Sequence, residues 1–406
     1  MMPNHRKQDV LFVTVGREAV PVSREAFVTL MESSVAGTYA DYRHALENGR
    51  IKLTRLEDLA HRGEIPLALF FAPDDVVKTQ VKRKNARLLR GLTQKGTFQI
   101  GGRHEIRLGE IDLLLKDLLR KQEQLKKIDD SLTINPVMGR LGDPNRPSED
   151  IAQTLVDLIG FSREQFQSYS KKADALEYFI DVLETKQILV SRSVRQTFMP
   201  QKIPKGFSGL TVRDKKIPYI FLPGGGEEEY YEPEGRRIFT LAILTVLVAQ
   251  KTFASVTWNH GEITTEAIDS KPEKAYDIAG SFLMPARDLK HFPLTTCEEV
   301  EVAANKFQVT PSAVIVRAAR SGMLPWPRAK AYLEEFRIRR ELIPKNKGFR
   351  TPREAASIAR YAGFEYVRRM FQAHDHGLLN NADFRLFVTL NRLQPDQFPE
   401  LRRAVI

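Results

Sequence analysis

Residues 236–249, RRIFTLAILTVLVA, decide the fold of the chain. After Arg237 the run is apolar on nearly every side of a helix with 3.6 residues per turn, a pattern typical of a helix that is buried all round. Its most apolar part, residues 241–249, is about half the length that a membrane-spanning helix needs. The stretch therefore predicts a central buried helix in a folded domain.

The segments upstream of this helix indicate a mixture of helices and strands. Residues 151–160 and 171–184 have helical periodicity. Residues 188–191 and 218–222 are β-branched or aromatic and are bounded by turn residues, which is typical of short strands. We expect a mainly α (α+β) fold with a small sheet.

Several segments, in sequence order, resemble the ImmA/IrrE family of metallopeptidases. Residues 236–242 are similar to the lead-in of the family's zinc-binding helix, and residues 279–285, AGSFLMP, to its AAELLMP segment. Residues 303–313, AANKFQVTPSA, are similar to a helix-turn of the family, and residues 175–190 to its first helix and strand. Residues 363–379 resemble the extension of its longer members. The resemblance implies a zincin-like α+β domain.

The N-terminal part of the chain resembles a different module. Residues 46–49, 56–60 and 65–71 (LENG, LEDLA and IPLALFF) are similar to the end of an XRE-type helix-turn-helix fused to this peptidase domain. We expect residues up to 75 to be helical. The predicted organisation is a helix-turn-helix head at 1–75, a basic helical linker at 76–150, an ImmA/IrrE-like domain at 151–335 and a helical C-terminal extension at 336–406.

The linker carries an apolar stripe at helical spacing, formed by Ile111, Leu115, Leu118 and Leu125 and interrupted by Gln122. The stripe could form a dimerising coiled coil, but it lasts little more than two heptads, and a confident prediction needs about three or four. An ordinary helix packed on its neighbours is the favoured interpretation.

The family's zinc site is altered in this chain. In the motif H-E-x-x-H, two histidines on one helical face bind zinc, and the glutamate polarises the bound water. Ile243 and Leu247 stand at the histidine positions and Leu244 at the glutamate position, and none of these side chains can bind a metal. The family's third ligand aligns with Pro272, and Glu273 is one residue away. The resemblance therefore implies a pseudo-metallopeptidase without catalytic activity, metal or cofactor.

The histidines of the chain do not restore this motif elsewhere. No pair of the eight has the H-E-x-x-H spacing. The cluster His374-Asp375-His376 lies in the tail, where solvated surface histidines are the favoured interpretation. A metallopeptidase that uses unrecognised ligands stays open as an alternative. The groove left by the lost site is a candidate site for a protein partner, a toxin or a small ligand.

The charge of the chain favours contact with nucleic acid or another anionic surface. The formal net charge is +11, and cationic side chains bind DNA by neutralising phosphates and releasing counterions. The candidate recognition helix covers residues 38–46. The expected contacts of this helix with double-stranded DNA are Tyr39, Tyr42, Arg43 and His44. Arg50 and Lys52 are expected to contact the DNA backbone. A basic run that could follow phosphates comprises Lys82, Arg83, Lys84 and Arg87. A degenerate head and a merely solvated basic helix are the alternatives.

Taken together, these patterns predict a DNA-binding transcriptional regulator of the repressor type, with the altered peptidase domain as a sensor or interaction module. The alternative is an antitoxin or protein-interaction module with a vestigial head. Cys297 is the single cysteine, so no disulfide is expected. The short apolar run before Arg17 does not fit a signal peptide. We expect a cytoplasmic protein, no membrane contact, and a homodimer that matches the symmetry of an operator.

Overall fold

The computed structural model describes residues 10–89, 99–100, 108–143, 145–194, 207–223, 232–252, 255–257, 274–342 and 353–405. These residues form two compact units. The first unit comprises the described residues of Met1–Gly96 and Glu105–Arg120, and the second those of Thr97–His104, Lys121–Phe198 and Gly206–Ile406. The described chain is mainly helical with two small sheets, which confirms the mainly α (α+β) prediction.

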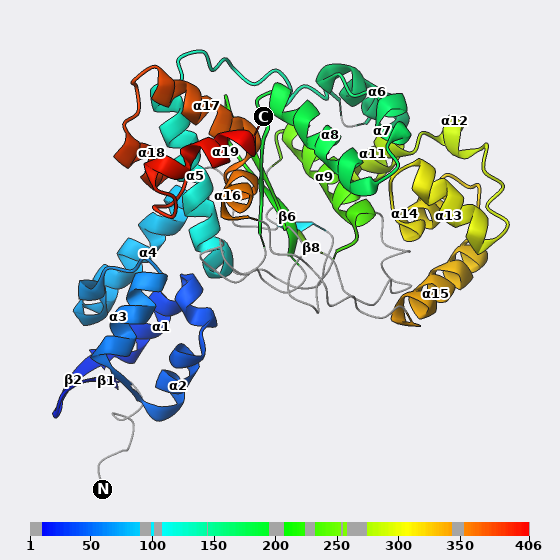
Figure 1. Cartoon of the computed structure of the whole chain (residues 1–406). Helices are drawn as coiled ribbons and strands as arrows, with labels where there is room; N and C mark the ends of the chain where they lie inside the picture. Colours follow the sequence, from blue (N-terminus) through cyan, green and yellow to red (C-terminus); the bar gives the residue numbers. More distant parts are fainter. Residues whose placement is uncertain are drawn as a thin grey trace, which may run out of the picture. The chain divides into compact units, whose positions relative to one another are not determined.

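The first unit combines a three-stranded sheet with helices (Figure 1). Strand β1 (Val10–Val15) pairs antiparallel with β2 (Glu18–Ser23) and parallel with β3 (Arg50–Lys52), so the strand order is β2-β1-β3. The helical elements are α1 (Arg24–Glu32), η2 (Val35–Thr38), α2 (Ala40–Asn48), α3 (Leu53–Arg62), η3 (Leu67–Phe71), α4 (Asp74–Leu89) and η4 (Leu108–Ile111).

The expectation that residues up to 75 are helical was wrong for all three of these strands. In β1, Leu11 and Val13 are buried while Phe12 is exposed, which is the period-two pattern of a strand with one face on the core. The hairpin turn is short and passes through Gly16 at φ 60°, a backbone conformation that glycine adopts without a steric penalty. The buried face of the sheet joins Phe27, Phe70 and other apolar side chains in one core.

The predicted linker is divided between the two units. Helix α4 belongs to the first unit, whereas α5 (Asp112–Ile128) begins in the first unit and ends in the second. The apolar stripe of α5 is buried within the chain, as the ordinary-helix interpretation expects. Gln122, which interrupts this stripe, donates a hydrogen bond from Nε2 to the backbone oxygen of Ile217 at 3.0 Å, so a buried partner explains the polar residue.

The second unit is built on a five-stranded mixed sheet of order β4-β8-β6-β7-β5. Its strands are β4 (Gln99–Ile100), β5 (Leu189–Arg192), β6 (Phe207–Val212), β7 (Tyr219–Leu222) and β8 (Ser255–Thr257). Strands β5 and β7 are parallel, and β6 is antiparallel to β7 and β8. The two strands predicted at 188–191 and 218–222 are confirmed as β5 and β7.

Helix α9 (Glu234–Ala249) contains the apolar run at residues 236–249. Every residue from 240 to 249 is buried, so the predicted central helix is confirmed. It packs against α8, α11, β6 and β7, and Figure 1 shows it alongside α8. The other helices up to residue 342 are α6 (Ser148–Ile159), α7 (Arg163–Ser168), α8 (Lys172–Thr185), α11 (Lys274–Leu283), α12 (Ala286–Leu289), α13 (Cys297–Lys306), α14 (Pro311–Arg320) and α15 (Trp326–Leu342).

The C-terminal helices belong to the second unit. They are α16 (Glu354–Ala362), α17 (Phe364–Asp375), α18 (Asn381–Phe387) and α19 (Phe398–Arg403), with η5 (Pro395–Gln397) between the last two. Helix α16 packs against β5. The backbone oxygen of Tyr361 accepts hydrogen bonds from Ser191 Oγ at 2.5 Å and from Lys121 Nζ at 3.1 Å. Polar groups of β5 and α5 thus hold the end of α16. Across the described ranges, no helix combines the length and the apolar character needed to span a bilayer.

Candidate nucleic-acid interface

The first unit presents the predicted DNA-binding residues around α2 and β3. Gly49 ends α2 at φ 63°, which favours glycine because a side chain would be strained there. Residues 49–52 then join α2 to α3, a connection as short as that of a helix-turn-helix. The difference from that motif is that residues 50–52 pair with β1 as a strand.

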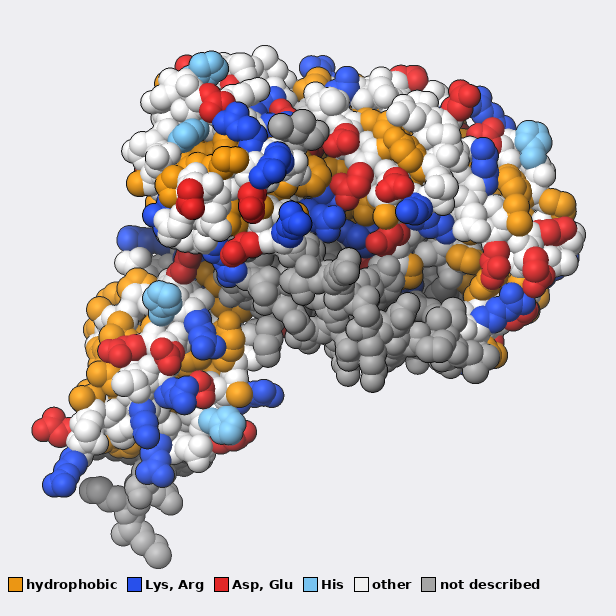
Figure 2. All heavy atoms as spheres, in the orientation of Figure 1, with side chains coloured by type: hydrophobic (Ala, Val, Ile, Leu, Met, Phe, Trp, Pro, Cys, Tyr) orange, Lys and Arg blue, Asp and Glu red, His pale blue; other side chains and the backbone are white. Residues whose placement is uncertain are grey.

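Four of the predicted contact residues are exposed on this part of the unit, and we call them the α2–β3 surface: Arg43, His44, Arg50 and Lys52. None of their side chains forms an ion pair or hydrogen bond with another residue that the structure describes. On β3 the buried Ile51 separates Arg50 from Lys52, so both cations lie on the outer side of the sheet. Figure 2 shows Lys and Arg side chains on the face of the first unit around α2.

The two tyrosines of the predicted recognition helix are less exposed than these four residues. Tyr42 is 5% exposed in the core of the first unit, and its hydroxyl donates to Glu32 Oε1 at 3.1 Å. Tyr39 is half-buried, with the guanidinium carbon of Arg62 5.2 Å from the centre of its ring. The structure therefore gives Tyr42 a packing role, because α2 turns this side chain toward α1 and away from solvent.

The basic run on α4 is also divided between free and paired side chains. Lys82, Arg83 and Arg87 are exposed and form no ion pair with a described residue; we call them the α4 surface. Lys84 instead points inward, where its Nζ donates to the backbone oxygen of Ser33 and lies 3.4 Å from Asp112 Oδ1. Lys84 is thus an internal ion-pair partner in the first unit.

The Lys84–Asp112 pair is buried at the Asp112 end. The Asp112 side chain is 0% exposed and also pairs with Lys116 at 3.1 Å. Burial lowers the pKa of Lys84 and raises the pKa of Asp112, while the opposite charge of each partner acts against both shifts. Removing one partner would leave an uncompensated buried charge, so we assign this pair to the fold and not to DNA contact.

Helix α9 buries the positions that the family resemblance aligns with zinc ligands and a catalytic glutamate. Ile243 and Leu244 are 0% exposed and Leu247 is 2% exposed. Pro272 and Glu273, the aligned third-ligand positions, lie outside the described residues. Within the described ranges, no group of three or more His, Cys, Asp or Glu side chains is arranged to hold a metal ion. What surrounds α9 in the described structure is a close-packed aliphatic core.

Of the two tail histidines, which we expected to be solvated, only His374 packs between C-terminal helices. His374 Nε2 lies 2.7 Å from Asn381 Oδ1, and the ring packs edge-on against Phe384 and Phe398. His376 follows the end of α17 and is exposed. The ring of His374 is thus packed, and the ring of His376 is solvated.

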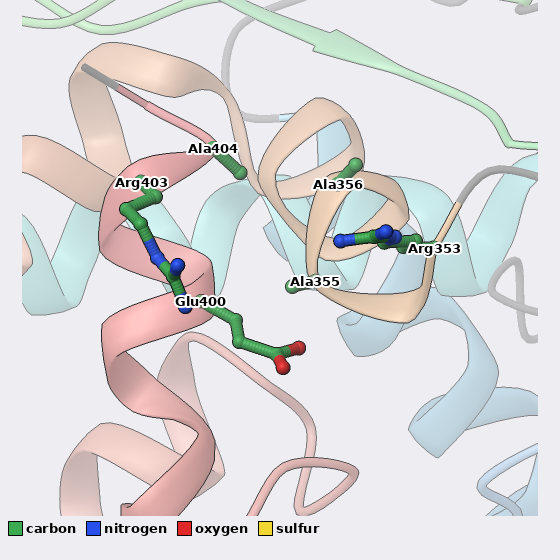
Figure 3. Close-up of a pocket in the computed structure, with 6 residues that line it drawn as sticks. All are labelled: Arg353, Ala355, Ala356, Glu400, Arg403 and Ala404. Carbon is green, nitrogen blue, oxygen red and sulfur yellow. The ribbon is translucent and has the colours of Figure 1, made fainter.

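The second unit contains a pocket of about 250 Å³ between α16 and α19. Figure 3 shows Arg353, at the start of α16, across from Glu400 and Arg403 of α19. Ala355, Ala356 and Ala404 complete its wall. None of these residues belongs to α9, so this pocket is not the groove that the family resemblance predicts.

A buried group of charges near the start of α9 was not found from the sequence. Arg192 is 4% exposed; it pairs with Glu177, and its guanidinium carbon lies 5.1 Å from the centre of the Phe364 ring. Arg237 pairs with Glu234 at 3.5 Å, and burial lowers the pKa of Arg237. Arg192 and Glu177 are distant in sequence from Arg237 and share no motif with it, so only the fold brings them near the start of α9.

No family model, no curated protein and no solved structure matches the chain.

Proposed function

We propose that the chain is a DNA-binding transcriptional regulator of the repressor type, and that its first unit contacts double-stranded DNA through the α2–β3 surface. One observation carries the proposal: Arg43, Arg50 and Lys52 are exposed without an ion-pair partner among the described residues. Elsewhere in the same unit, Lys78 pairs with Glu25 at 2.7 Å and Lys84 with Asp112. Some cations of the unit thus form ion pairs within the fold, whereas those of α2 and β3 are exposed to solvent.

Each group of the α2–β3 surface has a chemistry that suits DNA. The guanidinium of Arg43 can donate two hydrogen bonds to the O6 and N7 atoms of guanine in the major groove. Arg50 and Lys52, on a short strand beside α2, supply positive charge for phosphates, which position a protein on the duplex. The α4 surface supplies further charge for nonspecific attraction.

For the second unit we propose an ImmA/IrrE-like origin and no peptidase activity. Supporting this, aliphatic side chains fill the three α9 positions where the family has its zinc ligands and its catalytic glutamate. In this role the unit would sense a signal or bind a partner, and a homodimer would match a palindromic operator. All of these are proposals that follow from the family resemblance.

A protein-interaction or antitoxin role is the second candidate. Leu378 and Leu386, near the ends of α17 and α18, are 63% and 47% exposed, so both large apolar side chains are available for contact with a protein. This role predicts a protein that co-purifies with the chain and DNA binding that is no stronger than nonspecific binding.

Fluorescence anisotropy on DNA from upstream of the chain's own gene tests the proposal, with a scrambled duplex of equal length as the competitor. At about 150 mM salt we expect a preference of about a thousandfold or more, the lower end for specific binders. Arg43→Ala should lower specific affinity about 5- to 150-fold, the value of one good base contact. Lys290→Ala, at an exposed position of the second unit, is the control. Equal weak binding of both duplexes would contradict the proposal.

A further inference from the structure

The outer face of the first unit's sheet carries an exposed aromatic ring in its central strand. Phe12 of β1 is 45% exposed, although its neighbours Leu11 and Val13 are 0% exposed. Side chains alternate between the two faces of a strand. Phe12 therefore lies on the face opposite the core of the unit, and nothing in the described sheet covers it.

The strand register identifies the residues that share this face. Phe12 is paired with Pro21 of β2 on one side and with Arg50 of β3 on the other. Two residues further along β1, Thr14 is paired with Ala19 and Lys52. Since paired residues point to the same side of a sheet and adjacent strands lie about 4.8 Å apart, the two cations flank the central strand. The outer positions of the three strands include no carboxylate.

An aromatic ring beside two cations fits a nucleic acid whose bases are unstacked. Bases stack on aromatic side chains, while neighbouring cations follow the phosphate backbone. The bases of an intact duplex stack on one another, so their flat faces are not available to Phe12. A second copy of the chain would place Arg50 and Lys52 against their own counterparts, and like charges repel.

We propose that this face binds single-stranded DNA, with one base stacked on Phe12 and the adjacent phosphates on Arg50 and Lys52. The choice of DNA rests on the proposed function, while the preference for a single strand comes from the exposed ring. The unit would then have two uses for the same cations, duplex contact through the α2–β3 surface and single-strand contact through the sheet. A regulator that opens DNA locally would need both.

Anisotropy of the full chain with a labelled oligo-dT of about 15 nucleotides tests this proposal. Phe12→Ala should weaken binding about 5- to 150-fold, the range for removing one stacking platform. Phe71→Ala is the matched control, because Phe71 lies on η3 in the same unit and is 46% exposed; its affinity should stay within about twofold of wild type. A loss below twofold in Phe12→Ala, or an equal loss in both variants, would overturn the proposal.

A second variant reads out stacking directly. In Phe12→Trp, oligo-dT should quench the added indole emission, measured as the difference from the wild-type chain, because stacking places a base against the ring. Unchanged emission at saturation would overturn the proposal. The duplex assay separates the two hypotheses: specific duplex binding without oligo-dT binding refutes only the sheet proposal. Oligo-dT binding without duplex preference refutes only the proposed function.

Discussion

Glu184, in the last turn of α8, is the residue whose ionisation should control the stability of the second unit. Its side chain is 2% exposed. Its two carboxyl oxygens accept hydrogen bonds from the backbone N–H of Glu365 at 2.9 Å and of Val190 at 3.4 Å. Burial raises the pKa of Glu184 from 4.5 to about 8, and the two N–H donors act in the opposite direction.

The sign of the pH effect follows from this raised pKa. Between pH 4.5 and about 8, the folded chain holds a proton on Glu184 that the unfolded chain has released. Stability therefore falls as pH rises through this range. The contribution of Glu184 to the free energy of unfolding is complete below pH 4.5 and is lost once the pH exceeds about 8. Since each pH unit of such a difference corresponds to about 1.4 kcal/mol, the full effect is about 5 kcal/mol.

The perturbation is Glu184→Gln, which keeps the shape and removes the titration. Urea denaturation at pH 5 and at pH 8.5, followed by tryptophan fluorescence, reports on the second unit because Trp326, on α15, belongs to it. Between pH 5 and pH 8.5, we expect the free energy of unfolding to fall by about 3–5 kcal/mol more for the wild type than for Glu184→Gln. Glu354→Gln, at an exposed position, should behave as wild type. The same pH dependence in wild type and Glu184→Gln would refute the reasoning.

Three further substitutions test the packing. Gly209→Ala should lower the urea midpoint of the second unit, because a Cβ there would lie 2.8 Å from both the backbone oxygen of Phe221 and the Cδ1 of Leu244; an unchanged midpoint would contradict the close approach of β6 and α9. Leu244→Ala should cost about 2–5 kcal/mol of unfolding free energy in the same assay, because its side chain is 0% exposed and a cavity would remain; a loss below about 1 kcal/mol would refute dense packing around α9. Thr296→Ala should cost about 1 kcal/mol because it removes the capping box of α13; a midpoint equal to wild type would show that the cap contributes nothing.

The parts of the fold that could be predicted from sequence are those with a long or strongly apolar signal. The run at 240–249 has no polar face, so it could only be a buried helix, and the strands around Leu189 and Ile220 were bounded by turn residues. Strands β1 and β2 were missed because neither VLFVTV nor EAVPVS alternates cleanly between polar and apolar residues. The three residues of β3 carry no local signal, since only pairing with β1 makes them a strand.

The candidate site was predicted in part. Exposed cations such as Arg43 and Arg50 could be found from charge and position, but the direction of each side chain could not. Tyr42 and Lys84 face inward because α1 and α5 lie beside them with Glu32 and Asp112 as partners. Phe12 was missed because VLFVTV is apolar at five of its six positions, so the sequence does not show which face of the strand is exposed.

The salt dependence of duplex binding tests the central claim, that the first unit contacts DNA through Arg43, Arg50 and Lys52. For each phosphate contact removed, the slope of log K against log salt concentration should fall in magnitude by about 0.9. Arg50 and Lys52 are the two phosphate contacts among these residues, so the variant with all three changed to Ala should show a slope smaller by about 1.8 than wild type. A control with Arg140, Lys290 and Lys306 of the second unit changed to Ala, all exposed, should keep the wild-type slope. Equal slopes in wild type and the first-unit variant would contradict the account.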